Sequence, residues 1–182
     1  MLTPVPDIDL WNAAIGGNRD AFGELFRRHY GLLYQYGCKI CPDSELVEDN
    51  IQELFAETWQ RKPAQPILSV KAYLLQSLKF KLYRSFRKKG ETISLGLAAE
   101  EPFELSHETM LIDRQESAER AGLVLNALNR LPVRQKEIIY LRIYKGLSYE
   151  EISVIMELNY QVVRNLLCQA LKNFRKGVTK GV

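Results

Sequence analysis

Apolar residues recur at intervals of three and four through most of the chain, and this spacing constrains the fold more than any other feature. It is the repeat of an amphipathic α-helix, whose faces return about every 3.6 residues. One such series runs over 22–40 and a second over 47–58. A third helix is expected over about 70–89, with a buried stripe of Leu75, Leu78, Leu82 and Phe86. The sequence therefore predicts an all-α fold.

Two breaks interrupt the helical pattern. Pro63 and Pro66 require a loop or extended turn between the second and third helices. Farther along, the apolar periodicity lapses in an acidic stretch rich in Glu. We expect a flexible acidic linker over 91–112, joining two small helical domains at 1–90 and 113–182.

The second domain is predicted to contain four helices whose ends carry distinct signals. Pro132 suits the first turn of the second helix, and Gly146 ends it. Ser148 and Glu151 have the spacing of a capping box that begins the third helix. Asn159 can cap the last helix after a very short turn. Two helices joined so tightly indicate a helix-turn-helix.

The net charge of +3 conceals an uneven distribution. Residues 1–90 carry 13 basic and 10 acidic side chains, residues 91–120 carry 2 and 8, and residues 121–182 carry 10 and 4. Clustered basic charge is typical of nucleic-acid binding, because neutralised phosphates release counterions. The alternative is that the basic blocks are ordinary solvated helix faces.

Two predicted helix faces carry residue types suited to nucleic acid. On the third helix, Tyr73, Phe80, Arg84 and Arg87 share one side. Phe80 either packs under a neighbouring helix or stacks on a base while the arginines hold phosphates. On the last helix, the outward set is Gln161, Arg164, Asn165, Cys168 and Lys172. Arginine can contact guanine, and glutamine or asparagine can contact adenine, in the major groove.

Two segments resemble a known family. LVEDNIQELFAETW (46–59) is similar to conserved region 2, and LNRLPVRQKEIIYLRIYKGLSYEEIS (128–153) to region 4, of bacterial RNA polymerase sigma factors. Both occur in the order and separation of the sigma-70 family. Only two conserved domains fit this length, so the resemblance is to its small extracytoplasmic-function (ECF) group. It implies a transcription initiation factor that binds core RNA polymerase and directs it to specific promoters, aiding strand opening.

The resemblance also implies roles for particular residues. The polar face of the second helix would bind the polymerase through Asp49, Gln52 and Glu53. The third helix would capture the −10 element of promoter DNA through Lys79, Phe80, Lys81, Arg84, Arg87 and Lys88. The last helix would read the −35 element through Tyr160, Gln161, Arg164 and Asn165. An anti-sigma factor, often a membrane protein in this family, would be a further partner.

Two other interpretations remain open. A stand-alone helix-turn-helix regulator would explain the second domain but leave residues 20–90 without a role. A redox or metal sensor at Cys38 and Cys41 is less favoured, because structural zinc needs four ligands.

The sequence predicts a cytoplasmic protein that is not an enzyme. The sequence contains no P-loop or H-E-x-x-H motif and only two histidines. We therefore expect no catalytic residues, cofactor, metal or small-molecule substrate. Three cysteines make an odd count, and neither a secretory signal nor a membrane-length apolar run is evident. These features favour a reducing compartment.

Overall fold

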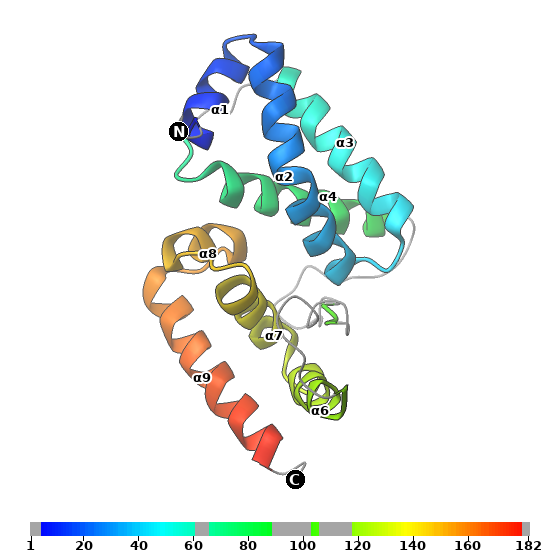
Figure 1. Ribbon diagram of the computed structural model, residues 1–182, viewed down its shortest axis with the longest axis vertical. Helices are drawn as coiled ribbons and strands as arrows, with labels where there is room; N and C mark the ends of the chain where they lie inside the picture. The colour runs from blue at the N-terminus through cyan, green and yellow to red at the C-terminus, as the bar shows by residue number, and fades with distance from the viewer. Residues whose placement is uncertain (1–4, 61–65, 89–102, 106–117, 180–182) are drawn as a thin grey trace. The chain divides into compact units, whose positions relative to one another are not determined.

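The computed structural model describes residues 5–60, 66–88, 103–105 and 118–179, and within these ranges the regular structure is helical (Figure 1). The chain forms two compact units, which divide after Ile93. The predicted all-α fold is confirmed. Among the described residues, no helix combines the length and the apolar composition that crossing a bilayer requires.

The N-terminal unit consists of α1 (Asp7–Ile15), α2 (Arg19–Ile40), α3 (Ser44–Gln60) and α4 (Val70–Lys88). Helix α2 packs against the other three, and α3 packs against α4. The predicted stripe on α4 is buried, with Leu75, Leu78 and Leu82 fully enclosed. Gly37 lies where α2 meets α3, and a Cβ there would come within 2.5 Å of Val47 Cγ1.

Helix α1 was not predicted from the sequence. Pro6 precedes it, and Asp7 and Asp9 lie in its first turn, where negative charge offsets the helix dipole. Trp11 is buried and contacts the Tyr73 ring edge to face, with centroids 5.2 Å apart. Tyr73 is therefore half-buried under α1, so the prediction that it shares an outward face with Phe80 is wrong.

Asp7 attaches α1 to α2 through two side chains. Arg28 Nη1 donates to Asp7 Oδ1 at 3.0 Å, and His29 Nε2 lies 3.0 Å from Asp7 Oδ2. His29 is buried. Burial lowers the pKa of His29, and the nearby carboxylate of Asp7 only partly opposes this shift. Burial thus favours the neutral imidazole of His29.

The C-terminal unit consists of α6 (Ala118–Asn129), α7 (Val133–Ile139), the π-helix η1 (Tyr140–Tyr144), α8 (Tyr149–Met156) and α9 (Tyr160–Thr179). Helix α9 packs against α6, α7 and α8. The sequence predicted a single continuous helix after Pro132, but its last turn, η1, widens to π geometry. Helices α8 and α9 form the predicted helix-turn-helix.

Both predicted caps of this motif are confirmed. Ser148 Oγ accepts from the Glu151 amide at 3.1 Å, and Glu151 Oε2 accepts from the Ser148 amide at 2.9 Å. Asn159 Oδ1 accepts from the Val162 amide at 2.9 Å and so begins α9. Between the helices, Glu157 adopts the left-handed conformation with φ of 52°.

Part of the predicted linker packs on the C-terminal unit. Phe103 and Leu105 are buried, and the Phe103 ring lies 5.6 Å from that of Tyr140. The Asn129 side chain bonds both backbone groups of Leu105, donating to the carbonyl at 3.0 Å and accepting from the amide at 3.3 Å. The other residues of 91–112 lie outside the described ranges. The domain boundaries at 90 and 113 stay predictions.

The positive φ of Glu157 predicts that a glycine at this position would stabilise the turn between α8 and α9. The amides of Glu157 and Leu158 donate to Val154 and Ser153, the hydrogen bonds of a Schellman motif, in which glycine is the usual residue. Glu157→Gly removes the Cβ strain of a positive φ, so the unfolding free energy should rise by about 0.5–1 kcal/mol. Hydrogen exchange of α8 and α9 amides measures this change.

The matched control is Gly146→Ala, because Gly146 has a φ of 64°. It should lower the stability of the same unit by about 1 kcal/mol. Both tryptophans, Trp11 and Trp59, lie in the other unit, so their fluorescence should report unchanged unfolding in either variant. A Glu157→Gly protein no more stable than wild type would contradict the strain argument.

Candidate functional site

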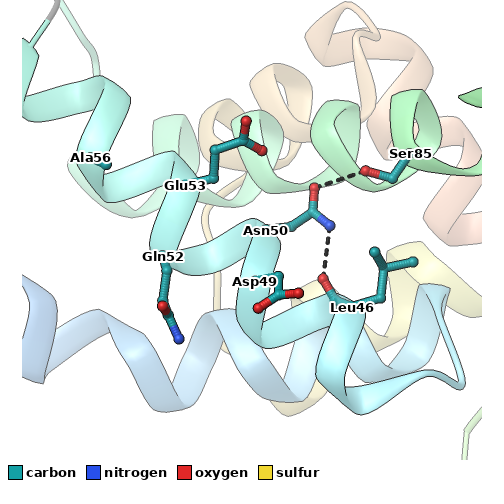
Figure 2. A pocket seen from close by; sticks show the side chains of 7 residues that line it. All are labelled: Leu46, Asp49, Asn50, Gln52, Glu53, Ala56 and Ser85. Atoms are coloured by element: carbon teal, nitrogen blue, oxygen red, sulfur yellow. Dashed lines mark hydrogen bonds between the residues drawn. The ribbon is translucent and has the colours of Figure 1, made fainter.

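The polar face of α3 borders a pocket between α3 and α4 (Figure 2). Asp49, Gln52 and Glu53, the three residues predicted to bind polymerase, all line it and are exposed. Its remaining lining residues are Leu46, Asn50, Ala56 and Ser85. The structure thus brings the three predicted residues together on one open surface.

Asn50 forms the polar floor of this pocket. Its side chain is buried, and its Nδ2 donates to the Leu46 carbonyl of the preceding turn at 2.7 Å. Its Oδ1 accepts from Ser85 Oγ of α4 at 3.1 Å. Figure 2 shows Asn50 between the two helices, making both bonds. Asn50 and Ser85 were not predicted as site residues, because their importance depends on a contact between distant segments.

Lys81, which was predicted to bind DNA, faces α3. Lys81 Nζ lies 3.0 Å from Glu53 Oε2 and 3.0 Å from Glu57 Oε1. Its side chain is only 13% exposed, whereas the two carboxylates are 62% and 54% exposed. The ammonium is thus paired within the protein, and most of the side chain that carries it is buried.

Three other residues predicted to bind DNA from α4, Phe80, Arg84 and Arg87, point to solvent. Phe80 is 44% exposed, so it does not pack under a neighbouring helix within its unit. Arg84 and Arg87 are exposed, and Lys79 is half-buried with its ammonium 5.8 Å from the Tyr83 ring centroid. The Lys88 side chain lies outside the described residues. An exposed aromatic among arginines is the arrangement that stacks bases and holds phosphates.

The segment before α4 adds an apolar side chain that sequence reasoning did not single out. Leu68 is 67% exposed, the most exposed large apolar side chain among the described residues. Ser69 follows it and caps α4, because its Oγ accepts from the Ala72 amide at 3.3 Å. Residues 61–65, in the predicted breaker loop, lie outside the described ranges.

The last helix presents its predicted polar face to solvent. Tyr160, Gln161, Arg164 and Asn165 are all exposed. Gln161 Nε2 donates to Asn165 Oδ1 at 3.1 Å. The Arg164 guanidinium lies 6.0 Å from the Tyr160 ring centroid, within the range of a cation–π contact. These four exposed side chains therefore lie on the first turns of α9 as two contacting pairs.

Two residues outside the predicted set support this surface from α8 and η1. The Tyr149 ring meets Tyr160 edge to face, with centroids 5.6 Å apart. The Arg142 guanidinium lies 4.7 Å from the Tyr149 centroid and donates to the Leu147 carbonyl at 2.7 Å. The capping pattern around Ser148 predicted α8, but it did not predict the contacts that Tyr149 makes with Tyr160 and Arg142.

The three cysteines all lie in the described ranges and none is in a disulfide. Cys41 is buried, Cys38 is half-buried and Cys168 is exposed. Burial raises the pKa of the Cys38 thiol, which lowers its fraction of reactive thiolate. Within the described ranges, no group of three or more His, Cys, Asp and Glu side chains is placed to hold a metal ion. These observations give no support to a sensor at Cys38 and Cys41.

Comparison with known families identifies both units. Residues 25–92 match the family described as Sigma-70 region 2, and residues 121–174 match Sigma-70, region 4. Together the two matches span about two thirds of the chain.

The chain is a member of the sigma-70 family.

Two relatives are similar over nearly the whole chain. RNA polymerase sigma factor NccH of Alcaligenes xylosoxydans xylosoxydans is 26% identical over 175 residues, 93% of each chain. ECF RNA polymerase sigma factor SigK of Mycobacterium ulcerans (strain Agy99) is 23% identical over 163 residues, 87% of this chain and 86% of that one. These relatives, the second of which is named an ECF sigma factor, support the assignment of the protein to the ECF group of this family.

Solved structures have the same fold. The structure of CnrH in complex with the cytosolic domain of CnrY matches with a TM-score of 0.62 at 21% identity, covering 97% of this chain and 99% of that one. The sigma factor RpoE, in complex with the anti-sigma factor NepR from Bartonella quintana, matches with a TM-score of 0.60 at 19% identity, covering 87% and 96%.

Family membership accounts for the separate surfaces of this sigma factor. The region 2 match contains the α3 pocket and the exposed face of α4, and the region 4 match contains the first turns of α9. Helix α1 precedes both matches. As an ECF sigma factor, the protein binds core RNA polymerase and directs it to specific promoters.

Proposed function

We propose that three surfaces divide the work of initiation among them. The exposed face of α3 around Asp49, Gln52 and Glu53 binds core RNA polymerase. The exposed face of α4 around Phe80 and Arg84 captures the opened −10 strand. The first turns of α9 read the −35 duplex. The observation that carries this proposal is the match of these surfaces to regions 2 and 4 of one family.

The α3 face supports polymerase binding by its combination of charge and shape. Asp49 and Glu53 are exposed beside a pocket with a buried polar floor. Exposed carboxylates around a concave surface favour a partner that presents basic side chains, because complementary charge steers association. Asp49 and Gln52 are exposed, and their packing against the described residues of the N-terminal unit does not require polar side chains.

The α4 face supports capture of single-stranded DNA. Phe80 offers an exposed ring for base stacking, and Lys79, Arg84 and Arg87 lie near it on the same helix. Base–aromatic stacking is worth about 1–3 kcal/mol per base, comparable to the cost of unstacking it from a duplex. Promoter opening on this surface is capture of a strand by binding energy, so the protein performs no bond-making chemistry.

The α9 face supports duplex readout. A helix-turn-helix places the N-terminal part of its second helix in the major groove. Gln161, Arg164 and Asn165 lie there and carry the donors and acceptors that read adenine and guanine. The edge-to-face contact between the Tyr149 and Tyr160 rings stabilises this surface.

We further propose that an anti-sigma factor sequesters the protein in the cytoplasm. The structural relatives CnrH and RpoE are each in complex with another protein, CnrY and the anti-sigma factor NepR. A partner that covers the α3 or α4 face would block polymerase or DNA directly.

The deciding experiment is run-off transcription with core RNA polymerase on genomic DNA, with and without the protein. New transcripts that share an upstream motif of two blocks would support promoter direction by this sigma factor. If the free protein instead binds duplex DNA tightly and adds no transcripts, the stand-alone regulator is the better interpretation.

The α3 assignment predicts the effect of Glu53→Ala. Loss of this exposed carboxylate should weaken binding to core polymerase by about five- to tenfold at low salt, with less effect at high salt, because exposed charges are screened. Binding of labelled protein to core polymerase measures the change. Asp9→Ala makes the same charge change at an exposed position of α1 and should leave the affinity unaltered. Equal affinities for all three proteins would remove the α3 assignment.

The α9 assignment predicts the effect of Arg164→Ala. Discrimination at one base pair of the −35 element should fall by about 1–3 kcal/mol, while preferences at other positions persist. Transcription from a library of −35 variants by the reconstituted holoenzyme measures this. The control is Arg134→Ala, which removes the same charge from an exposed position of α7. An unchanged base preference in the Arg164 variant would show that α9 is not the reader.

A further inference from the structure

A polar seam joins α3 to α4 beneath the proposed polymerase-binding face. It consists of three contacts: the hydrogen bond from Ser85 to Asn50, and the ion pairs of Lys81 with Glu53 and with Glu57. Ser85 and Lys81 are four residues apart and so lie on one side of α4. Residue numbers rise along α3 as they fall along α4, so the two helices run antiparallel at this seam.

The side chains of Lys81, Glu53 and Glu57 differ in how exposed they are, and this difference indicates the role of the polar seam. The Lys81 side chain is 13% exposed, whereas those of Glu53 and Glu57 are 62% and 54% exposed. The Lys81 ammonium already has two carboxylates as partners within the protein. The carboxylates, in contrast, keep much of their surface open to a partner.

Glu53 and Glu57 need a cation between them to hold their positions. They are one turn apart on α3, and like charges at this spacing repel each other. The Lys81 ammonium contacts both at 3.0 Å and offsets this repulsion. Without it, the two side chains would spread into water in several rotamers, and a partner would have to order them on binding.

We propose that Lys81 is a positioning residue of the polymerase-binding surface and makes no contact with DNA. It holds Glu53 and Glu57 in the conformation that the polymerase binds. This inference rests on the proposed role of the α3 face. It reassigns a residue that the family resemblance had placed with the −10 contacts.

The seam has a consequence for strand capture. Lys81 and Ser85 fasten α4 to α3, while Phe80 and Arg84, next to them in sequence, point away to solvent. The position of the exposed α4 face is thus fixed relative to the α3 face. Polymerase bound to α3 thereby sets where Phe80 and Arg84 meet the −10 strand.

The test measures how fast the full-length protein leaves core polymerase. Lys81→Met keeps the length of the side chain and removes its charge. Dissociation should accelerate by about three- to tenfold, because disordered carboxylates bind less well. Association should be unchanged or faster, since the surface becomes more acidic. Lys81→Arg restores a cation and should dissociate as slowly as wild type.

Two further variants separate positioning from charge and from folding. Lys71→Met removes the same charge from the beginning of α4 and should leave the dissociation rate unaltered. Glu53→Gln/Glu57→Gln changes only exposed side chains, so this protein should fold. Adding Lys81→Met to it should produce no further acceleration, because the ammonium then has no carboxylates to hold. Thermal unfolding checks that each variant is folded.

The opposite pattern would overturn the inference. If Lys81→Met dissociates at the wild-type rate but opens the −10 element poorly, measured by permanganate reactivity of unpaired thymines, Lys81 is a DNA contact. If it accelerates dissociation equally in the Glu53→Gln/Glu57→Gln protein, it acts by another route. A wild-type protein that does not bind core polymerase would instead refute the proposed function itself.

Discussion

Burial of one apolar stripe per helix is the constraint on which both units depend. In the N-terminal unit, α2 is shared by the other three helices, so its buried face determines where each of them lies. In the C-terminal unit, α9 has the corresponding role. The opposite faces of α3, α4 and α9 are largely exposed, and the ion pairs of Lys81 with Glu53 and Glu57 join the α4 and α3 faces. The functional side chains stand on those faces, at spacings that the helices fix.

Much of this could be predicted from the sequence because it is local. The stripe on α4, the capping box of Ser148 and the Asn159 cap each depend on residues within a few turns of one another, and all are confirmed. The exposure of the α3 and α9 faces follows from the same periodicity. Family resemblance then supplied the roles, and the matches to regions 2 and 4 support the identification.

What the sequence did not predict depends on contacts between distant segments. Tyr73 is covered by α1, which was not predicted because this helix is short. Lys81 has the residue type and helix position of a DNA contact, and only the fold of α3 against α4 reveals its two carboxylate partners. A basic residue on a predicted helix is therefore weaker evidence for a DNA contact than the exposure of its side chain in the structure.

Site-specific photocrosslinking in the assembled promoter complex tests the central claim most directly. A photoreactive residue would replace Ala56 at the rim of the α3 pocket, Phe80 on α4, or Val162 on α9, all of which are exposed. The account predicts crosslinks from position 56 to a polymerase subunit, from position 80 to the opened −10 strand, and from position 162 to the −35 duplex. Crosslinks from position 56 to DNA, or from position 80 to polymerase alone, would contradict it.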